Sequence, residues 1–186
     1  MAALARGFLA IVPPPSALDA LEDRLGREGV VEPSLRWTTR AQWHATLQYL
    51  GRVVDADAVI DAVRPAARTV VPPSVRLGGA GAFPKARRGT VLWLGFCEGS
   101  TALAGLAAAV ADATATVGFD SVDRRFAPHL TLARSRTPVD LRARIDSLGA
   151  DPVGPEWAVG DVVLFESETR ADRARYSEIS RMPLVV

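Results

Sequence analysis

Cysteine is nearly absent from this chain of 186 residues, and that scarcity excludes several kinds of site. Cys97 is the only thiol, so no disulfide can form within the chain and nothing indicates an oxidising compartment. It ends the apolar run that begins at Val91, where we expect a buried and unreactive side chain. The sequence also contains no Cys/His cluster and no HExxH motif, so it lacks the usual ligand patterns of zinc.

Long hydrophobic runs and a large net charge are missing as well. No segment reaches membrane-spanning length, and the apolar stretch before Pro13 is too short for a signal peptide. The formal net charge is +1, so any affinity for a polyanion must come from local clusters of arginine. We therefore expect a globular monomer of the cytoplasm, with no cofactor and no obligate protein partner.

The two histidines are the most informative residues that are present. His44 and His129 both open the tetrapeptide His-x-Thr-Leu, and each tetrapeptide lies in a stretch of alternating apolar residues. Such alternation predicts two β-strands, with Thr46 on the face of His44 and Thr131 on the face of His129. In the first strand it also places Gln48 and Leu50 on the histidine face, and on the other face Trp43, Ala45, Leu47 and Tyr49.

The rest of the chain alternates between expected strands and helices. Strands are expected at 7–12, 35–38, 43–50, 75–83, 91–96, 129–132, 157–165 and 175–180, and helices at 16–25, 56–68, 100–117 and 138–148. Each half therefore contains a strand, a helix, a His-x-Thr-Leu strand, a helix and a strand. We expect one α/β (α+β) domain over residues 1–186, in which the approximate repeats 1–89 and 90–186 form similar lobes around a cleft.

Several helix ends carry signals of their own. Ser16, Ser100 and either Asp55 or Asp57 are expected to cap the first three helices. Pro65 lies inside the second helix and is expected to kink it or end it early, because proline lacks the N–H that a helix uses.

Two imidazoles across a cleft suit a reaction that removes one proton and delivers another, such as the opening of a phosphodiester. The hydroxyls of Thr46 and Thr131 can donate to phosphate oxygens, and Arg134 can add a charged contact. This chemistry requires no metal. A lone histidine on a strand is usually a packed or surface residue, but the same threonine at the same offset in both copies favours a shared site.

The other cations are open to a simpler interpretation. Arg134 and Arg136 follow the second motif and could equally be solvated charges. Lys85, Arg87 and Arg88 form a basic loop that suits solvent, although such a loop near the cleft could hold an RNA backbone. Their role is left open.

The two motifs resemble the signature of the two-histidine phosphoesterases, and the chain is similar to their RNA 2′,3′-cyclic phosphodiesterase family, also called 2′-5′ RNA ligases. The resemblance runs along almost the whole chain. It is carried by the stretches Arg6–Ile11, Leu35–Thr38, Trp43–Gly51, Gly81–Pro84, Val91–Gly95, Pro128–Arg134 and Val163–Ser167.

The resemblance implies a bilobal fold with pseudo-symmetric, antiparallel-rich lobes covered by helices, and hydrolysis of an RNA terminal 2′,3′-cyclic phosphate to a 2′-phosphate. It implies that His44 is the proton donor and His129 the proton acceptor, while Thr46, Thr131 and Arg134 bind the phosphate. Nothing in the residues themselves distinguishes the two histidines.

Three alternatives follow from motifs that contact only a phosphate. The enzyme could join RNA as a 2′-5′ ligase, or it could hydrolyse small cyclic nucleotides or 2′-5′ oligonucleotides. A module that binds RNA ends without catalysis is the third, and it is disfavoured because both histidines and both threonines are intact. The expected binding partners are thus RNA ends or nucleotide cyclic phosphates.

Overall fold

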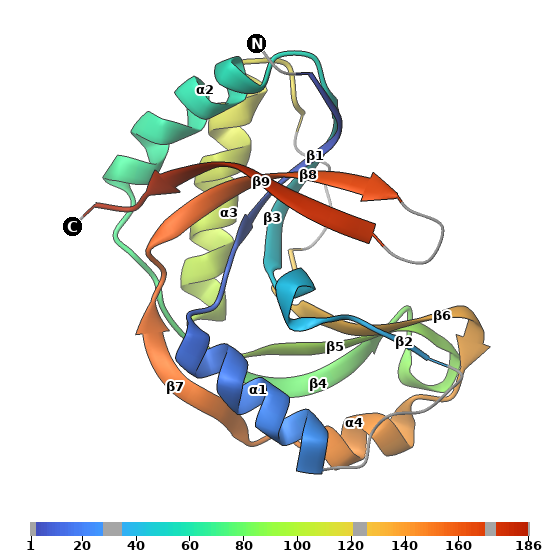
Figure 1. Ribbon diagram of the computed structural model, residues 1–186. Coiled ribbons are helices and arrows are strands. Elements are labelled where there is room, and N and C mark those ends of the chain that lie inside the picture. Colours follow the sequence, from blue (N-terminus) through green and yellow to red (C-terminus); the bar gives the residue numbers. More distant parts are fainter. Residues whose placement is uncertain (1–2, 28–34, 121–125, 170–173, 186) are drawn as a thin grey trace.

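A computed structural model describes residues 3–27, 35–120, 126–169 and 174–185 of the chain (Figure 1). Its strands are β1 (Leu4–Ile11), β2 (Arg36–Trp37), β3 (Ala45–Val53), β4 (Ser74–Phe83), β5 (Gly89–Glu98), β6 (Leu130–Val139), β7 (Pro152–Ala158), β8 (Asp161–Thr169) and β9 (Ala174–Pro183). The α-helices are α1 (Pro15–Arg27), α2 (Ala56–Thr69), α3 (Ser100–Ala115) and α4 (Arg142–Leu148), with 3-10 turns η1 (Arg40–Gln42) and η2 (Ala86–Arg88).

All the described strands belong to one sheet of nine, whose order is β7-β4-β5-β6-β3-β1-β8-β9, and β2 also pairs with β6. Every pairing in it is antiparallel. Among the described residues, β3 and β6 pair only through Ala45 and Leu130, and the sheet divides there into two lobes. The expected α+β bilobal architecture is confirmed.

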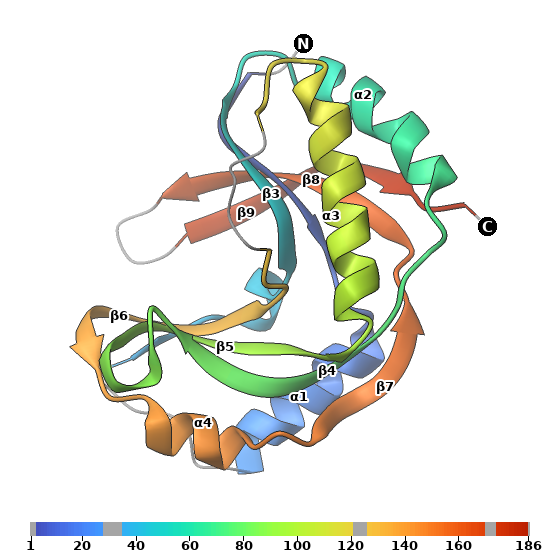
Figure 2. The ribbon, with the colours of Figure 1, turned by 180° about the vertical axis from the view of Figure 1, so that it is seen from behind.

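Each lobe is covered by its own pair of helices (Figures 1 and 2). Helices α2 and α3 pack together beside the lobe of β3, β1, β8 and β9, while α1 packs on β7 and α4 on β4 in the other lobe. Apolar side chains of the sheet and of all four helices form the core between them. None of the described helices is both long enough and apolar enough to span a membrane.

The two lobes do not correspond to the two halves of the chain, so that expectation is wrong. Helix α1 follows β1 but packs in the other lobe, and α3 follows β5 but packs against β3. Strand β1 lies inside the sheet, with Leu9, Ala10 and Ile11 all fully buried, and therefore needs a partner on each edge. The C-terminal strand β8 supplies the second edge.

The expected strand 157–165 is in fact two strands, which carry the chain from one lobe to the other. Strand β7 pairs with β4, whereas β8 pairs with β1. Between them, the Val159 amide donates to the Pro73 carbonyl at 2.9 Å, which leaves Gly160 at the crossing. The expected hairpin of β8 and β9 is confirmed, with pairs from Asp161–Pro183 to Thr169–Ala174.

Two of the expected helix caps are also wrong. Helix α1 begins at Pro15, so Ser16 lies within it, and α3 is capped by Gly99, whose φ of +78° suits glycine. Ser100 instead donates its hydroxyl to the Phe96 carbonyl at 2.9 Å. Asp55 does cap α2, because its Oδ1 accepts the backbone amides of residues 57 and 58.

Helix α2 continues through Pro65 to Thr69, so proline does not end it early. The lost hydrogen bond is offset by packing, since Val59, Val63 and Ala67 on one side of the helix are buried in the core.

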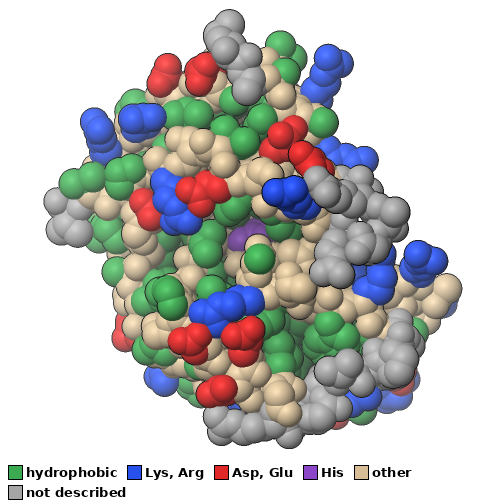
Figure 3. Space-filling model, in the orientation of Figure 1, with side chains coloured by type: hydrophobic (Ala, Val, Ile, Leu, Met, Phe, Trp, Pro, Cys, Tyr) green, Lys and Arg blue, Asp and Glu red, His purple; other side chains and the backbone are tan. Residues whose placement is uncertain are grey.

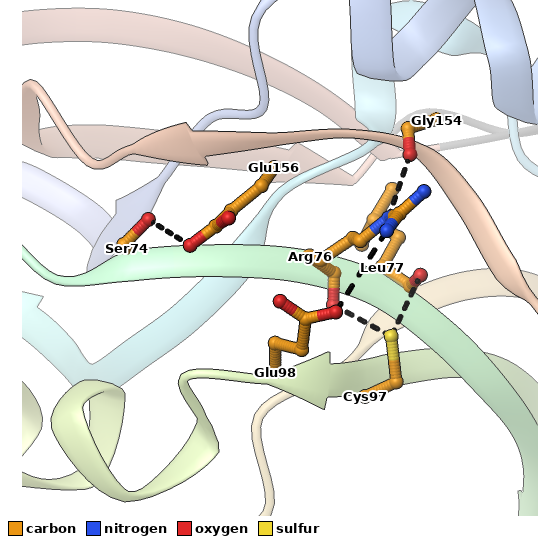
Figure 4. A network of polar contacts seen from close by, with 7 residues as sticks. All are labelled: Ser74, Arg76, Leu77, Cys97, Glu98, Gly154 and Glu156. Atoms are coloured by element: carbon orange, nitrogen blue, oxygen red, sulfur yellow. Dashed lines mark hydrogen bonds and ion pairs between the residues drawn. The ribbon is translucent and has the colours of Figure 1, made fainter.

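Cys97 is exposed, contrary to the expected buried thiol. Phe96 points into the core, so its neighbour on β5 must point to the other face of the sheet. There the thiol donates to the carbonyls of Arg76 and Leu77, at 3.6 and 3.3 Å (Figure 4). The Arg76 guanidinium lies between Glu98 and the Gly154 carbonyl.

Candidate active site

The two histidine motifs meet where the lobes join. His44 and His129 each lie immediately before the paired residues Ala45 and Leu130, at the starts of β3 and β6. Both paired residues are fully buried, so their neighbours along the strands point to the opposite face of the sheet. In an antiparallel pair, this arrangement brings His44 opposite Thr131, and Thr46 opposite His129.

A cavity of about 220 Å³ lies over this junction. Figure 3 shows histidine in a hollow near the middle of the molecular face, bordered by apolar and uncharged side chains. The cavity contains all five residues expected from the sequence, and its lining consists of Phe8, Thr38, Gln42, His44, Thr46, Tyr49, His129, Thr131, Arg134, Ser167 and Tyr176.

A β-bulge at the leucine of each motif extends this lining along the strands. On β3, Thr46 pairs with Ala10 and Gln48 with Leu9, so Leu47 is an extra residue. On β6, residues 131 and 133 likewise pair with consecutive residues of β5, and residue 132 is extra. A bulge of one residue reverses the alternation beyond it.

The bulges determine which side chains reach the cavity. Tyr49 and Arg134, each five residues after a motif histidine, both line it. Strict alternation would have turned them away, so the expected positions of Tyr49 and Gln48 are wrong. Gln48 points instead to helix α3, where its Oε1 accepts the hydroxyl of the buried Thr114 at 2.7 Å.

The His44 ring is enclosed by aromatic side chains. Phe8 stacks on it with ring centroids 4.8 Å apart, and Tyr176 meets it edge-on at 4.9 Å. The pKa of His44 is lowered from 6.5 to about 4, mainly by burial and also by the charges of His129 and Arg134. A hydrogen bond with the backbone of Gln42 acts in the opposite direction. His44 is therefore neutral at pH 7 in the free protein.

The His129 ring is less enclosed. Phe83 meets it edge-on with centroids 4.9 Å apart, and Trp93 lies 6.0 Å away. Burial lowers its pKa, and the charge of Arg134 adds to this, while a hydrogen bond to Ala127 raises it. In that bond Nδ1 lies 2.7 Å from the Ala127 carbonyl, which can only accept. Nδ1 therefore carries the proton, and Nε2 of the neutral ring is a free base.

Hydrogen-bond donors surround the two rings. Thr46 and Thr131 are half-buried on the cavity face, and the exposed Arg134 guanidinium donates to the Thr131 hydroxyl at 3.5 Å. Because this oxygen also accepts from Arg134, its own hydrogen is free to point into the cavity. Two hydroxyls and a guanidinium can thus contact the oxygens of one anion.

Other expected cations lie elsewhere. Lys85, Arg87 and Arg88 form and flank η2, which packs near α4, and none of them lines the cavity. Arg136 is exposed on β6 outside the lining. The described residues contain no group of three His, Cys, Asp or Glu side chains that could hold a metal ion.

The sequence pattern missed the aromatic side of the site. Phe8 and Tyr176 line the cavity from β1 and β9, and Trp93 is half-buried beside His129. A Cβ on Gly81 would overlap the Trp93 ring, so the glycine of the stretch Gly81–Pro84 is what lets this ring lie flat on β4. That glycine was the one signal available for its position.

The fold and the paired histidines define a two-histidine phosphoesterase architecture, and comparisons with known proteins agree. The family model of the 2′-5′ RNA ligase superfamily matches residues 13–171. An Aquifex aeolicus protein named RNA 2′,3′-cyclic phosphodiesterase is 30% identical over 124 residues, which is 65% of this chain and 66% of that protein. The chain thus spans just under two thirds of this relative's length.

Solved structures give the same result. The Thermus thermophilus protein TT0787 superposes with a TM-score of 0.76 at 25% identity, covering 96% of this chain and 97% of that one. Escherichia coli LigT, crystallised with 3′-AMP, gives 0.72 at 25% identity, with coverage of 97% and 98%. The chain belongs to the 2′-5′ RNA ligase superfamily.

Proposed function

We propose that this protein is an RNA 2′,3′-cyclic phosphodiesterase, which opens a terminal cyclic phosphate to a 2′-phosphate by acid–base catalysis. The observation that carries the proposal is that one cavity is lined by both histidines, both threonines and Arg134. The name of the Aquifex relative and the 3′-AMP in the LigT crystal support the substrate class.

His129 is the proton acceptor in this proposal. Its Nδ1 proton is held by the Ala127 carbonyl, which fixes the tautomer whose Nε2 accepts a proton from water. The water oxygen then attacks phosphorus as its proton passes to Nε2.

His44 is the proton donor in the same reaction. As the bond from phosphorus to O3′ breaks, His44 gives a proton to O3′, which leaves the phosphate on O2′. The donor must be protonated when substrate is bound, although the pKa of His44 is about 4 in the free protein. The negative charge of the bound phosphate opposes this effect, because an adjacent opposite charge raises the pKa of an imidazole.

Thr46, Thr131 and Arg134 are assigned to the phosphate oxygens, where charge accumulates in the transition state. The step needs no metal, since the two imidazoles carry both protons.

The decisive experiment uses an RNA oligonucleotide that ends in a 2′,3′-cyclic phosphate, incubated with the protein in excess EDTA near neutral pH. The expected product is the 2′-phosphate, distinguished from the 3′-phosphate by chromatography against both standards. An intact cyclic end would refute the activity. A 3′-phosphate would refute the proposed leaving oxygen, and turnover that EDTA abolishes would refute metal independence.

A further inference from the structure

Thr38 lies on the cavity wall but carries no role in the proposed chemistry. It directly follows β2, at the point where the chain leaves β6 and passes through η1 before it returns to β6 at Ala45. Strands β2 and β3 are therefore two parts of one interrupted strand along β6. The residues between them, 38–44, end at His44.

The Thr38 hydroxyl connects both histidine motifs. Its Oγ1 lies 2.8 Å from the Thr131 carbonyl and 2.9 Å from the Leu132 carbonyl, and donates its proton to this pair. The backbone amide of Thr38 also donates to Leu132, at 2.9 Å. These carbonyls belong to the bulge of β6, where one residue has no partner on β5.

The same oxygen accepts a hydrogen bond from the residue that directly precedes the first histidine motif. The indole Nε1 of Trp43, the residue before His44, donates to Thr38 Oγ1 at 3.0 Å. Trp43 is buried in the core, with 4% of its surface exposed, so its ring is fixed by packing. The hydroxyl has one proton, which the carbonyls receive, so none is left for a substrate.

We propose that Thr38 is a positioning residue, which holds the Trp43–His44 and Thr131–Leu132 segments in a fixed relation across the junction of the lobes. The inference rests on the proposed function, in which His44 and Thr131 act on the same phosphate. A small displacement of reacting groups can lower a rate by about a hundredfold. Loss of the hydroxyl should therefore lower kcat more than it raises KM.

The test compares T38V, which removes the hydroxyl at nearly constant volume, with T38S, which keeps it. The matched control is T69V, because Thr69 also donates to a carbonyl, that of Ala66, on an exposed helix end. On the cyclic-phosphate RNA, kcat of T38V should fall about tenfold to a hundredfold. KM should change little, and T38S and T69V should stay within about threefold of the parent.

W43F removes the indole donor and keeps an aromatic ring, and its kcat should also fall, to a smaller extent. The double variant T38V/W43F should be no slower than T38V, because both changes break the same connection. An unchanged kcat in folded T38V would overturn the proposal, as would an equal loss in T38S. If T38V does not fold, W43F with the parent kcat overturns it.

Imidazole NMR shifts of His44 and His129 test the same point without turnover. Both should move in T38V and in W43F but not in T69V, and unchanged shifts in the first two would overturn the positioning role. If the parent protein fails to open the cyclic phosphate, the proposed function falls, and the NMR shifts alone then decide whether Thr38 positions the two motifs.

Discussion

The surroundings of His44 and of His129 differ, although the two histidines occupy matching places in matching motifs. His44 is stacked on Phe8 and closed in by Tyr176, and its pKa falls to about 4. The pKa of His129, beside Phe83 and Trp93, is lowered less. The tetrapeptide therefore sets where each imidazole points, while distant strands determine how readily it takes a proton.

The difference runs against the proposed roles until a substrate is present. The donor, His44, is the imidazole that binds a proton more weakly in the free protein. A donor whose pKa is low gives up its proton readily, so the same burial assists the step once the phosphate has induced protonation. We infer that substrate charge sets the protonation of His44, while the tautomer of His129 is already fixed by Ala127.

The largest expected effect is the loss of either histidine. H44Q and H129Q should each lower kcat about a hundredfold to ten-thousandfold, because each removes one proton transfer. The pH profile of kcat/KM distinguishes the two variants. In H44Q, kcat/KM should still rise with pH as the base His129 loses its proton. In H129Q, kcat/KM should only fall with pH as the acid His44 loses its proton. The profile is measured from about pH 4 to 9 on cyclic-phosphate RNA, and the same remaining limb in both variants would contradict the assignment.

The second prediction concerns the charge of the ligand. Inorganic phosphate in the cavity should raise the pKa of His44 by about two units, towards its ordinary value. The pKa of His129 should rise less, because it starts closer to that value. Imidazole NMR titrations with and without phosphate measure both, and R134Q serves as the control because it should weaken phosphate binding. Equal pKa changes at the two histidines would contradict the proposed difference in how strongly the substrate charge affects them.

The sequence predicted which side chains of the two motifs share one cavity, because the relevant signal is local. Histidine and threonine two residues apart on a strand always share a face, so the His-Thr surfaces of both motifs were predictable without any knowledge of their partners. The doubled motif also predicted that the two surfaces would meet. Arg134 lines the cavity together with both motifs, although the reason is a bulge that no pattern in the sequence revealed.

What could not be predicted depends on contacts between distant segments. A bulge is defined by the register of two strands, so Leu47 and Leu132 look like ordinary strand residues in the sequence. The crossing of α1 to the other lobe depends on its packing against β7, which lies far along the chain. The low pKa of His44 depends on Tyr176, which lies far along the chain on β9.

The third prediction tests the difference between the histidines through stability. Unfolded histidine takes up a proton as the pH falls through 6.5, whereas folded His44 does so only near 4. Protonation therefore favours the unfolded state in this window. The free energy of unfolding should fall by about 2 kcal/mol as the pH is lowered from about 8 to about 5. Urea unfolding at both pH values measures the loss. This pH-dependent decrease in stability should be smaller in H44Q than in H129Q. Equal decreases in the two variants would argue against the unequal burial of the two histidines.

The smallest expected effect distinguishes the two threonines. T46V removes one hydrogen bond to the phosphate, which should lower kcat/KM about tenfold, or ~1.4 kcal/mol. T131V removes the matching bond and also the acceptor of Arg134, at 3.5 Å, so its loss should be severalfold larger. Serine at either position keeps the hydroxyl and serves as the control.

The double variant R134Q/T131V identifies the cause of the extra loss in kcat/KM. If Arg134 accounts for it, T131V in the R134Q background should lower kcat/KM no more than T46V does in the parent. A larger cost in that background would mean that Thr131 itself contacts the phosphate more strongly than Thr46, and the difference between the lobes would then lie in the threonines rather than in the arginine.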